Sequence, residues 1–481
     1  MKTTTLVCSA VFACNLMVMI VANPSIVDAQ RIAYKTHDIL TNLNCPWEIR
    51  WGKDNWIWFT ERAGRFNRVD PATGERKMLL FEKEVYSISE LGMLGFDFHP
   101  DFPDSPFIYL DYTVADSTFY PDTIYYFEKV VRYRYTPDTL TERTTIFKGI
   151  KAYFQHNGSR VVVGPDRKLY VSSGETWFEP ELAQQDSSPN GKILRLNLDG
   201  SIPEDNPWKR SPVWTKGHRN PQGLAFGPDG TLYSSEHGPA NDDEFNIIIK
   251  GRNYGWPMVE GFCDKPNEMQ ACADSDVVEP VVAWTPTIAL SGIDYYDNDR
   301  IPEWKNSILV MSLKDESIWQ LKMDSTRKKV MAQTRYHVRL SQPDSLKDSV
   351  VYAKRLRDVC FSPDGRVFVS TSNVWSVDWT PDRIFEITRT GVSGVIEPIK
   401  EKMKESITVT PNPAADHIRV NGGFPPGKAQ LTITDQLGRI MMQKNSSSGT
   451  DEISLQGFAA GVYFLNLRSS EGMNIIPFIK Q

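Results

Sequence analysis

Pairs of short apolar strands joined by a tight turn recur along most of the chain. In the clearest copy, residues 223–226 lead into the turn Pro228–Gly230 and then into a second strand at residues 233–235. Proline fixes φ at the start of such a turn, and glycine admits the positive φ at its end. Five further copies of this strand–turn–strand pattern start near residues 46, 94, 159, 291 and 358.

This repetition predicts an all-β fold, because the strands are short, the turns are regular and helical periodicity is almost absent. Each copy, with the chain that follows it, is long enough for a four-stranded sheet. Six such sheets around one axis make a six-bladed β-propeller over residues 30–390, an architecture that leaves few exposed sheet edges. A single large β-sandwich does not explain six copies of one turn.

The pattern stops after residues 383–387, and a second small unit of strands follows. Residues 391–405 are rich in charge and are interpreted as a linker. Strands are predicted at residues 406–409, 431–434 and 461–465. Residues 406–481 are therefore expected to form a small β-sandwich domain.

The first 29 residues have the features of an export signal. Lys2 precedes an apolar run from Leu6 to Ala22, and Ala29 ends a small-residue cleavage site. A lipoprotein start at Cys14 is the alternative, but the apolar run continues beyond that cysteine, which is the wrong order for a lipid-anchored segment. No later segment has the ~20 apolar residues of a membrane-spanning helix. We expect residues 1–29 to be removed and no integral membrane span to remain.

Charge and cysteine content narrow the partners and the compartment. The 481 residues carry a formal net charge of −6 with a pI near 5.8, which argues against nucleic acid or an anionic membrane surface as the main partner. Export exposes cysteines to oxidising conditions, so Cys263 and Cys272, which bracket a polar loop, are predicted to form a disulfide. Cys45 and Cys360 either pair with each other or remain buried thiols.

Three segments concentrate polar and charged side chains where strands end. They are residues 217–223, 235–246 and 251–257, which contain arginine, asparagine, histidine and acidic residues. A buried strand needs none of these groups at its ends. Loops at one mouth of a β-ring bring such ends together, so we expect a ligand site there.

Several motifs in a fixed order carry a specific resemblance. They are Gly217–Gly223, His156–Arg160, Gly191–Arg195, Ser312–Lys314 and Arg355–Val359. Together they resemble the soluble glucose and aldose sugar dehydrogenases that depend on pyrroloquinoline quinone (PQQ), over about residues 40 to 390. No single motif would suffice. The resemblance implies a quinone-dependent oxidation of sugars on a six-bladed propeller.

The resemblance also implies a cofactor pocket. PQQ is a tricarboxylate with an ortho-quinone, so an acidic protein must gather cations around it. The implied cations are Lys314, Arg355 and Arg357. The other implied cofactor contacts are Arg219, Asn220, Thr287 and Glu90. Glucose dehydrogenases carry glutamine at the position of Glu90, and a carboxylate so close to an anionic cofactor must be protonated or paired with an arginine.

Oxidation of the C1 hydroxyl of a sugar needs a base that takes the proton while hydride leaves for the quinone. His156 matches the catalytic histidine of the family, and an imidazole suits this task near neutral pH. Arg219 is implied to stabilise the negative charge that develops on the quinone. Gln155 stands where glucose dehydrogenases place an acid beside the histidine. His99 is interpreted as a structural turn residue, and His237 as a residue that lines the site.

Calcium is a hard cation that prefers oxygen ligands, including backbone carbonyls. By the family pattern, Gly238 and Pro239 offer carbonyls to a Ca²⁺ that also contacts PQQ and acts as a Lewis acid. A second, structural Ca²⁺ is implied at Asp243, Glu244 and the carbonyl of Tyr254. Its remaining family ligands come from a loop that has a different sequence here.

The sequence therefore predicts a PQQ- and Ca²⁺-dependent dehydrogenase that oxidises the C1 hydroxyl of aldose sugars to lactones and passes electrons to an external acceptor. The departures at residues 90 and 155 leave the preferred sugar open. A Ca²⁺-dependent lactonase on a propeller would have no use for a lysine and two arginines late in the ring. A non-catalytic propeller that binds glycans or proteins would be expected to have lost His156, Lys314 or the two arginines, and all are present.

The end of the chain carries its own resemblance. Residues 410–414, 435–439 and 455–463 resemble, in that order, the C-terminal sorting domain of type IX secretion cargo. A carbohydrate-binding sandwich is the alternative. The sorting domain implies the type IX secretion machinery as a partner and passage through the periplasm and outer membrane. We therefore expect the protein to be secreted or displayed at the cell surface.

Overall fold

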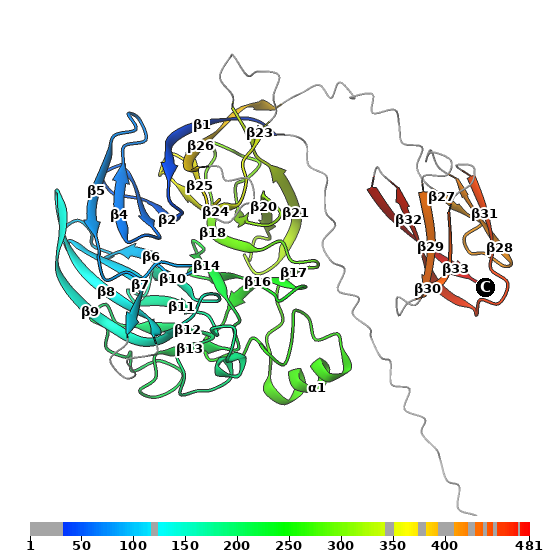
Figure 1. Cartoon of the computed structure of the whole chain (residues 1–481), viewed down its shortest axis with the longest axis horizontal. Helices are drawn as coiled ribbons and strands as arrows, with labels where there is room; N and C mark the ends of the chain where they lie inside the picture. The colour runs from blue at the N-terminus through cyan, green and yellow to red at the C-terminus, as the bar shows by residue number, and fades with distance from the viewer. Residues whose placement is uncertain are drawn as a thin grey trace, which may run out of the picture. The chain divides into compact units, whose positions relative to one another are not determined.

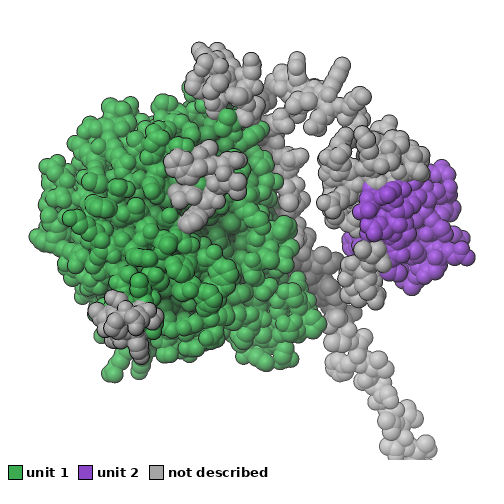
Figure 2. Space-filling view, in the orientation of Figure 1, with its two compact units in different colours: residues 1–392 green, residues 393–481 purple. Residues whose placement is uncertain are grey.

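The structure, a computed structural model, divides into two compact units, residues 1–392 and 393–481, drawn in green and purple in Figure 2. It describes residues 32–116, 124–341, 351–373, 381–392, 408–421, 429–435, 440–445, 450–469 and 472–481. The expected export signal (residues 1–29) and residues 393–405 of the expected linker lie outside the described residues.

The described residues of the first unit contain six four-stranded antiparallel sheets. The first three are β2 (Pro46–Trp51), β3 (Ile57–Glu61), β4 (Arg65–Val69) and β5 (Arg76–Phe81); β6 (Met93–Phe98), β7 (Phe107–Asp116), β8 (Tyr125–Thr136) and β9 (Thr139–Ala152); and β10 (Gly158–Val163), β11 (Leu169–Ser173), β12 (Lys192–Leu196) and β13 (Val213–Lys216).

The remaining sheets continue in chain order until the last one. They are β14 (Pro221–Phe226), β15 (Leu232–Glu236), β16 (Asp243–Ile248) and β17 (Val282–Trp284); β18 (Leu290–Tyr296), β19 (Ser307–Ser312), β20 (Ser317–Met323) and β21 (Val330–His337); and β24 (Leu356–Phe361), β25 (Val367–Thr371), β26 (Asp382–Val392) and β1 (Ile32–Leu43). A small extra ribbon pairs β22 (Arg339–Leu340) with β23 (Val351–Tyr352).

The first strand of each sheet lies at the centre of the unit. β2 contacts β6, β6 contacts β10, β10 contacts β14, and the series continues through β18 and β24 back to β2. The six sheets therefore surround a common axis, as Figure 1 shows. Each predicted strand–turn–strand copy supplies the beginning of one sheet. Because the two strands are antiparallel, the residues before the first strand and after the second meet at the same end of the axis.

The sixth sheet takes its outer strand from the beginning of the chain. β1 pairs antiparallel with β26, with Asp38 opposite Phe385, and Arg383 forms an ion pair of 2.7 Å with Asp38. The repeat pattern does not reveal this pairing, because β1 has no partner strand beside it in the sequence. The two ends of the unit thus close the ring.

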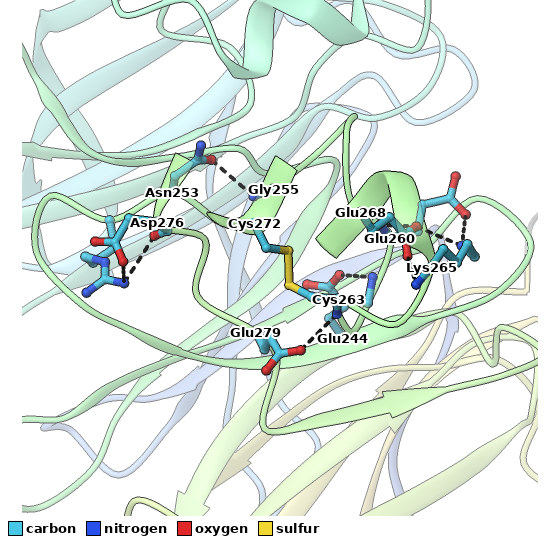
Figure 3. The surroundings of a disulfide bond; sticks show 12 residues. Glu244, Asn253, Gly255, Glu260, Cys263, Lys265, Glu268, Cys272, Asp276 and Glu279 are labelled. Carbon is cyan, nitrogen blue, oxygen red and sulfur yellow. Dashed lines mark hydrogen bonds and ion pairs between the residues drawn. A yellow bond between two sulfur atoms is a disulfide. The ribbon is translucent and has the colours of Figure 1, made fainter. Parts of the chain in front are cut away.

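The loop between Cys263 and Cys272 contains a helix, where the sequence suggested only a polar loop. The predicted disulfide is present, with Cα atoms 6.3 Å apart, and α1 (Pro266–Ser275) fills the segment beside it (Figure 3). Proline in the first turn and the side chain of Glu268, which accepts the N–H of Lys265, start this helix. The other two cysteines of the described residues, Cys45 and Cys360, are buried free thiols. Within the described residues, no helix is long and apolar enough to cross a membrane.

Two carboxyl groups are buried in the core between the second and third sheets. Asp111 lies opposite Val130, and Glu128 lies opposite Thr113, so both side chains project from one face of the sheet as diagonal neighbours. Both are fully buried, and their four oxygens have no hydrogen-bond partner among the described residues. The Ser159 hydroxyl approaches Glu128 and lowers its pKa, but without hydrogen-bond geometry.

Burial raises the pKa of Asp111 and Glu128 well above the usual range, and the charge of Asp111 raises that of Glu128 further. A carboxyl group with a raised pKa binds its proton more tightly in the folded state than in the unfolded state. It stabilises the folded state fully below its unfolded pKa, near 4, and this contribution is lost as the pH rises through the folded pKa. The protein is therefore expected to become less stable as the pH rises above about 4.

Replacing both groups with amides, Asp111→Asn with Glu128→Gln, is expected to raise the free energy of unfolding at pH 7 by about 1–3 kcal/mol, because an amide is neutral at every pH and needs no proton uptake when it is buried. Melting temperatures of the two proteins between pH 4 and 8 measure this effect, and the variant should show the flatter profile. A variant that is less stable and has also lost a bound metal ion would show that a cation, and not protons, neutralises the pair.

The described residues of the second unit form two antiparallel sheets. One contains β27 (Thr408–Thr410), β28 (His417–Asn421) and β31 (Thr450–Ser454), and the other contains β30 (Ile440–Asn445), β29 (Ala429–Asp435), β32 (Gly461–Ser469) and β33 (Gly472–Lys480). Both contribute to one apolar core, for example through Val409 and Ile418 from the first sheet and Leu431 and Leu465 from the second.

Candidate active site

The axis of the first unit contains a cavity of about 420 Å³ at the end where first strands begin and second strands end. All six sheets contribute to it. The lining residues are Cys45, Trp47, Arg62, Ser89, Glu90, Leu94, Gln155, Asn157, Gly158, Gln222, His237, Ala289, Leu313, Arg355, Arg357 and Ser372. Three arginines face one glutamate in this lining, so the cavity carries a positive charge inside an acidic protein.

A second cavity, of about 320 Å³, lies at the other ends of the same strands. Its charged lining residues are Glu48, Arg50, Asp97, Arg160, Asp294 and Asp358, four acids against two arginines. An anionic ligand is repelled by such a lining and attracted by the arginine-lined cavity. The first cavity is therefore the candidate site for an anionic cofactor.

Two arginines reach the cavity from the start of β24. Arg357 is only 7% exposed and donates from Nη1 to Oε1 of Gln222 over 2.7 Å, while its Nε has no partner among the described residues. Arg355 donates from Nε to the carbonyl of Ser372, also over 2.7 Å. Burial lowers the pKa of both, that of Arg357 to about 10. Buried guanidinium groups with unused donors are suited to bind an anion.

Arg219 and Asn220 lie just before β14 and contact residues that line the cavity. Nη1 of Arg219 donates to the carbonyls of His237 and Gly238, each over 3.0 Å. Asn220 is fully buried, and its Oδ1 accepts the N–H of Gly158 over 3.1 Å. Nε of Arg219 and Nδ2 of Asn220 have no partner within the described part of the chain. Both side chains thus keep donors available beside the cavity.

His156 precedes β10, and Glu175 follows β11 of the same sheet. Nδ1 of His156 lies 2.8 Å from Oε1 of Glu175, and because a carboxylate only accepts, Nδ1 carries the proton. Nε2 has no hydrogen-bond partner among the residues that the structure describes. The backbone N–H of His156 donates to Glu90 of the cavity wall over 2.9 Å. The imidazole therefore has one nitrogen fixed and one nitrogen available.

A second histidine–glutamate pair occupies the equivalent position one sheet further on. Nδ1 of His218 lies 2.9 Å from Glu236, but its Nε2 lies 2.9 Å from the hydroxyl of Thr215 and the ring is fully buried. Both nitrogens of His218 are therefore occupied. Of the two pairs, only that of His156 can accept a proton without first breaking a hydrogen bond.

The acid beside His156 comes from a position that the sequence did not indicate. Gln155 stands where glucose dehydrogenases place an acid, and in the structure its side chain lines the cavity. The acid that is hydrogen-bonded to the imidazole of His156 is instead Glu175, 19 residues later in the chain. Glu90 also lines the cavity, and its negative charge acts on Arg219 and on both arginines of β24. Glu90 thus lies within electrostatic range of three arginines, and the direct pairing that the sequence required stays a prediction.

The other two histidines of the sequence analysis are poorer candidates for the base. His237 lines the cavity and its Nε2 is hydrogen-bonded to the carbonyl of Leu290. Burial, followed by the positive charge of Arg219, lowers the pKa of His237 to about 3, so it is neutral. His99 accepts the N–H of Asp101 in a turn, over 3.2 Å.

Lys314 and Thr287 lie beside the cavity and do not line it. Lys314 is exposed, and its Nζ lies 3.2 Å from Oγ1 of Thr287. Their neighbours Leu313 and Ala289 belong to the cavity wall. These two predicted cofactor contacts therefore stand at the rim.

The expected calcium ligands contact N–H donors in this structure. The carbonyl of Gly238 accepts Arg219, as described above, and Pro239 lines a small space of about 10 Å³ together with Glu236 and Glu244. These groups offer only oxygens, which suits Ca²⁺. The described residues contain no group of three or more His, Cys, Asp or Glu side chains that could hold a metal ion.

The side chains expected at the second calcium site form hydrogen bonds within the protein. Asp243 accepts three backbone N–H bonds, from Gly238, Ile288 and Ala289. Glu244 accepts Asn246 and the N–H of Gly261, and the hydroxyl of Tyr254 donates to the carbonyl of Ile247. A carboxylate that accepts N–H groups can still bind a metal ion through its remaining lone pairs, so this site stays a prediction.

Sequence reasoning missed Glu175 and the roles of Trp47, Arg62 and Gln222. The sequence contains one pattern that could have identified Glu175. A glutamate recurs at or just after the end of the second strand in three sheets, as Glu61, Glu175 and Glu236. Each holds a group that precedes the first strand of the same sheet: the N–H of Asn44, the imidazole of His156 and that of His218. Reading the repeats against one another would have paired Glu175 with His156.

Comparison with known proteins divides the chain in the same way. Residues 43–413 match the family model described as glucose/sorbosone dehydrogenase, and residues 408–481 match that of the secretion system C-terminal sorting domain. Quinoprotein glucose dehydrogenase B of Acinetobacter calcoaceticus is 34% identical, over 70% of this chain and 85% of that protein. An aldose sugar dehydrogenase of Escherichia coli is 30% identical, over 68% and 87%.

Among solved structures, the PQQ-bound aldose sugar dehydrogenase of Streptomyces coelicolor superposes with a TM-score of 0.61. It is 28% identical, and the match covers 76% of this chain and 99% of that one. The apo form of the soluble aldose sugar dehydrogenase of Escherichia coli gives a TM-score of 0.62 at 26% identity, over 74% and 100%.

Proposed function

Because the chain belongs to the glucose/sorbosone dehydrogenase family, we propose that it oxidises the C1 hydroxyl of aldose sugars to lactones with PQQ and Ca²⁺ and with His156 as the base. The family and its members support a PQQ-dependent sugar oxidoreductase. The catalytic domain of the proposal is a six-bladed propeller over residues 30–390. The observation that carries the proposal is a free imidazole nitrogen beside a cavity lined with arginines.

The charge and the unused donors of the cavity fit PQQ. When bound, PQQ would supply an ortho-quinone that accepts the hydride of the sugar and, with it, the two electrons of the oxidation. Arg355 and Arg357 would bind its carboxylates, with Lys314 and Thr287 at the rim. Nε of Arg219 and Nδ2 of Asn220, which lack partners among the described residues, would donate to its oxygens and stabilise negative charge there.

The histidine provides the proton transfer. Nε2 of His156 takes the proton of the C1 hydroxyl while the C1 hydrogen leaves as hydride, so that the C–H and O–H bonds break and the carbonyl of the lactone forms. Glu175 keeps Nδ1 protonated and stabilises the imidazolium that results. Two electrons per sugar then pass to an external acceptor.

Calcium enters the proposal only at the carbonyls of Gly238 and Pro239. There the two backbone oxygens would hold the ion, which would supply Lewis-acid chemistry to the bound cofactor. The expected second site at Asp243, Glu244 and Tyr254 is not part of the proposal, because the described residues contain no group of three or more His, Cys, Asp or Glu side chains that could hold a metal ion.

The second unit fits an exported enzyme. Residues 408–481 match a secretion sorting domain, which we propose to be a small β-sandwich that directs the protein through the type IX machinery. The enzyme would then act outside the outer membrane, in the medium or at the cell surface.

Reconstitution tests the proposed function. The purified protein, supplied with PQQ and Ca²⁺, is expected to reduce an artificial dye with at least one aldose of a panel of glucose, galactose, xylose and maltose. PQQ should also raise the melting temperature by several degrees, since a ligand that binds only the folded state stabilises it. Chelation of the metal should abolish turnover. No dye reduction with any sugar, together with no PQQ-dependent stabilisation, would leave a non-catalytic binding propeller as the function.

A further inference from the structure

A stack of aromatic rings extends from the imidazole of His156 to solvent. Trp177 lies parallel to His156, with ring centres 5.4 Å apart and an interplanar angle of 13°. Phe178 lies 6.2 Å beyond Trp177 at 20°, and Tyr153 meets Phe178 edge-on at 4.7 Å. Trp177 is 50% exposed and Phe178 66%. Large apolar rings that stand in water beside a cavity usually mark a binding surface.

The backbone holds these rings in an unfavourable conformation. Thr176 and Trp177 both have positive φ, 73° and 65°, and for a β-branched and a bulky residue this is a strained region. Glu175 stabilises the turn, because one of its oxygens accepts the N–H of Trp177 while the other holds Nδ1 of His156. A single carboxylate therefore fixes both the base and the aromatic surface relative to each other.

We propose that Trp177 and Phe178 form a subsite for the sugar unit attached to the one being oxidised, so that the enzyme acts preferentially on the reducing ends of oligosaccharides. This inference rests on the proposed function. The two rings begin beside the base and lead from it to solvent, which is a direction in which the rest of an oligosaccharide can leave the cavity.

The chemistry of the surface favours a saccharide over the other occupants of an aromatic patch. The C–H faces of sugar rings are apolar and match the faces of indole and phenyl rings, while polar groups at the edge bind hydroxyls. Lys151 and Glu179 supply such an edge, with an exposed ion pair at 3.0 Å. A protein partner would need about 800 Å² on each side, and the exposed faces of Trp177 and Phe178 alone are far smaller than this.

Phe178→Ala is the discriminating variant, because Phe178 does not contact His156. We expect it to raise KM about tenfold for the preferred trisaccharide among cellotriose, maltotriose and xylotriose, which corresponds to the loss of one aromatic contact. Its KM for the matching monosaccharide should stay within about twofold, as should kcat for both substrates. Phe81→Ala removes another exposed phenylalanine, on the outer strand β5, and serves as the matched control.

A binding measurement separates the subsite from the chemistry. The methyl glycoside of the preferred trisaccharide has no free C1 hydroxyl and cannot be oxidised, so calorimetry of the PQQ-loaded enzyme reports binding alone. Its Kd should rise about tenfold in Phe178→Ala and stay unchanged in Phe81→Ala. If monosaccharides are oxidised but no trisaccharide is preferred, or if Phe178→Ala affects every sugar equally, the subsite is wrong and the proposed function stands. If no sugar is oxidised and no glycoside binds, both fail.

Discussion

His156→Ala is expected to lower kcat at pH 7 by about 10³-fold, because the variant has no group to take the C1 proton and general-base catalysis typically contributes 10²–10⁴-fold. Binding of PQQ should change little, since the side chain of His156 holds Glu175 and stacks on Trp177 but is not part of the cavity wall. Stopped-flow reduction of the loaded cofactor by sugar measures the step directly.

Glu175→Gln tests the orientation of the same imidazole. The amide can donate to Nδ1, which would move the proton to Nε2 and give the wrong tautomer for a base, so kcat should fall by about 10²-fold or more. His99→Ala removes a histidine that accepts Asp101 in a turn and should leave kcat unchanged. A His156→Ala enzyme with near-normal rate would show that another group takes the proton.

Arg357→Met is expected to weaken PQQ binding by about 10²–10⁴-fold, because removal of one partner of a buried ion pair costs about 3–5 kcal/mol. The stability of the PQQ-free protein should not suffer from the same substitution. Burial lowers the pKa of Arg357, which means that the folded protein disfavours the charge of this side chain. The melting temperature of the PQQ-free variant should therefore not fall. Titration of each protein with PQQ, followed by absorbance and by thermal shift, gives both quantities.

Lys314→Met provides the comparison for a cation at the rim. Lys314 is exposed and contacts Thr287, and exposed ion pairs contribute at most about 1 kcal/mol, so PQQ affinity should fall no more than about fivefold. Equal losses for the two variants would mean that the cofactor does not enter the buried cavity. A large loss for Lys314→Met alone would place the anion at the surface.

The ring could be predicted because its signal is local. A turn such as Pro228–Gly230, with an apolar strand on each side, involves only about a dozen neighbouring residues. This strand–turn–strand pattern occurs six times in the sequence. The pairing of β1 with β26 was not predictable in this way, since it joins the two ends of the unit. α1 was missed because its sequence is short and polar, and its capping by Lys265 and Glu268 becomes visible only in the structure.

The site was predictable where a side chain acts alone and not where it acts through a partner. The resemblance and their charge together implied Arg355 and Arg357, and both line the cavity. The partner of His156 comes from another strand, so nothing next to the histidine in sequence identifies Glu175. The resemblance implied a metal at Asp243, and the structure adds that its carboxylate accepts backbone N–H groups of two loops, a role that the sequence did not indicate.

The pairing of β1 with β26 sets the order in which an exported chain becomes an enzyme. Asp38 and Arg383, which join these strands, are 345 positions apart, and closing so long a loop costs roughly 5 kcal/mol of chain entropy. The first strand must therefore stay unpaired until β26 is available. The cavity needs Trp47 from the first sheet and Arg357 from the sixth, so it is complete only after the two ends of the ring have joined.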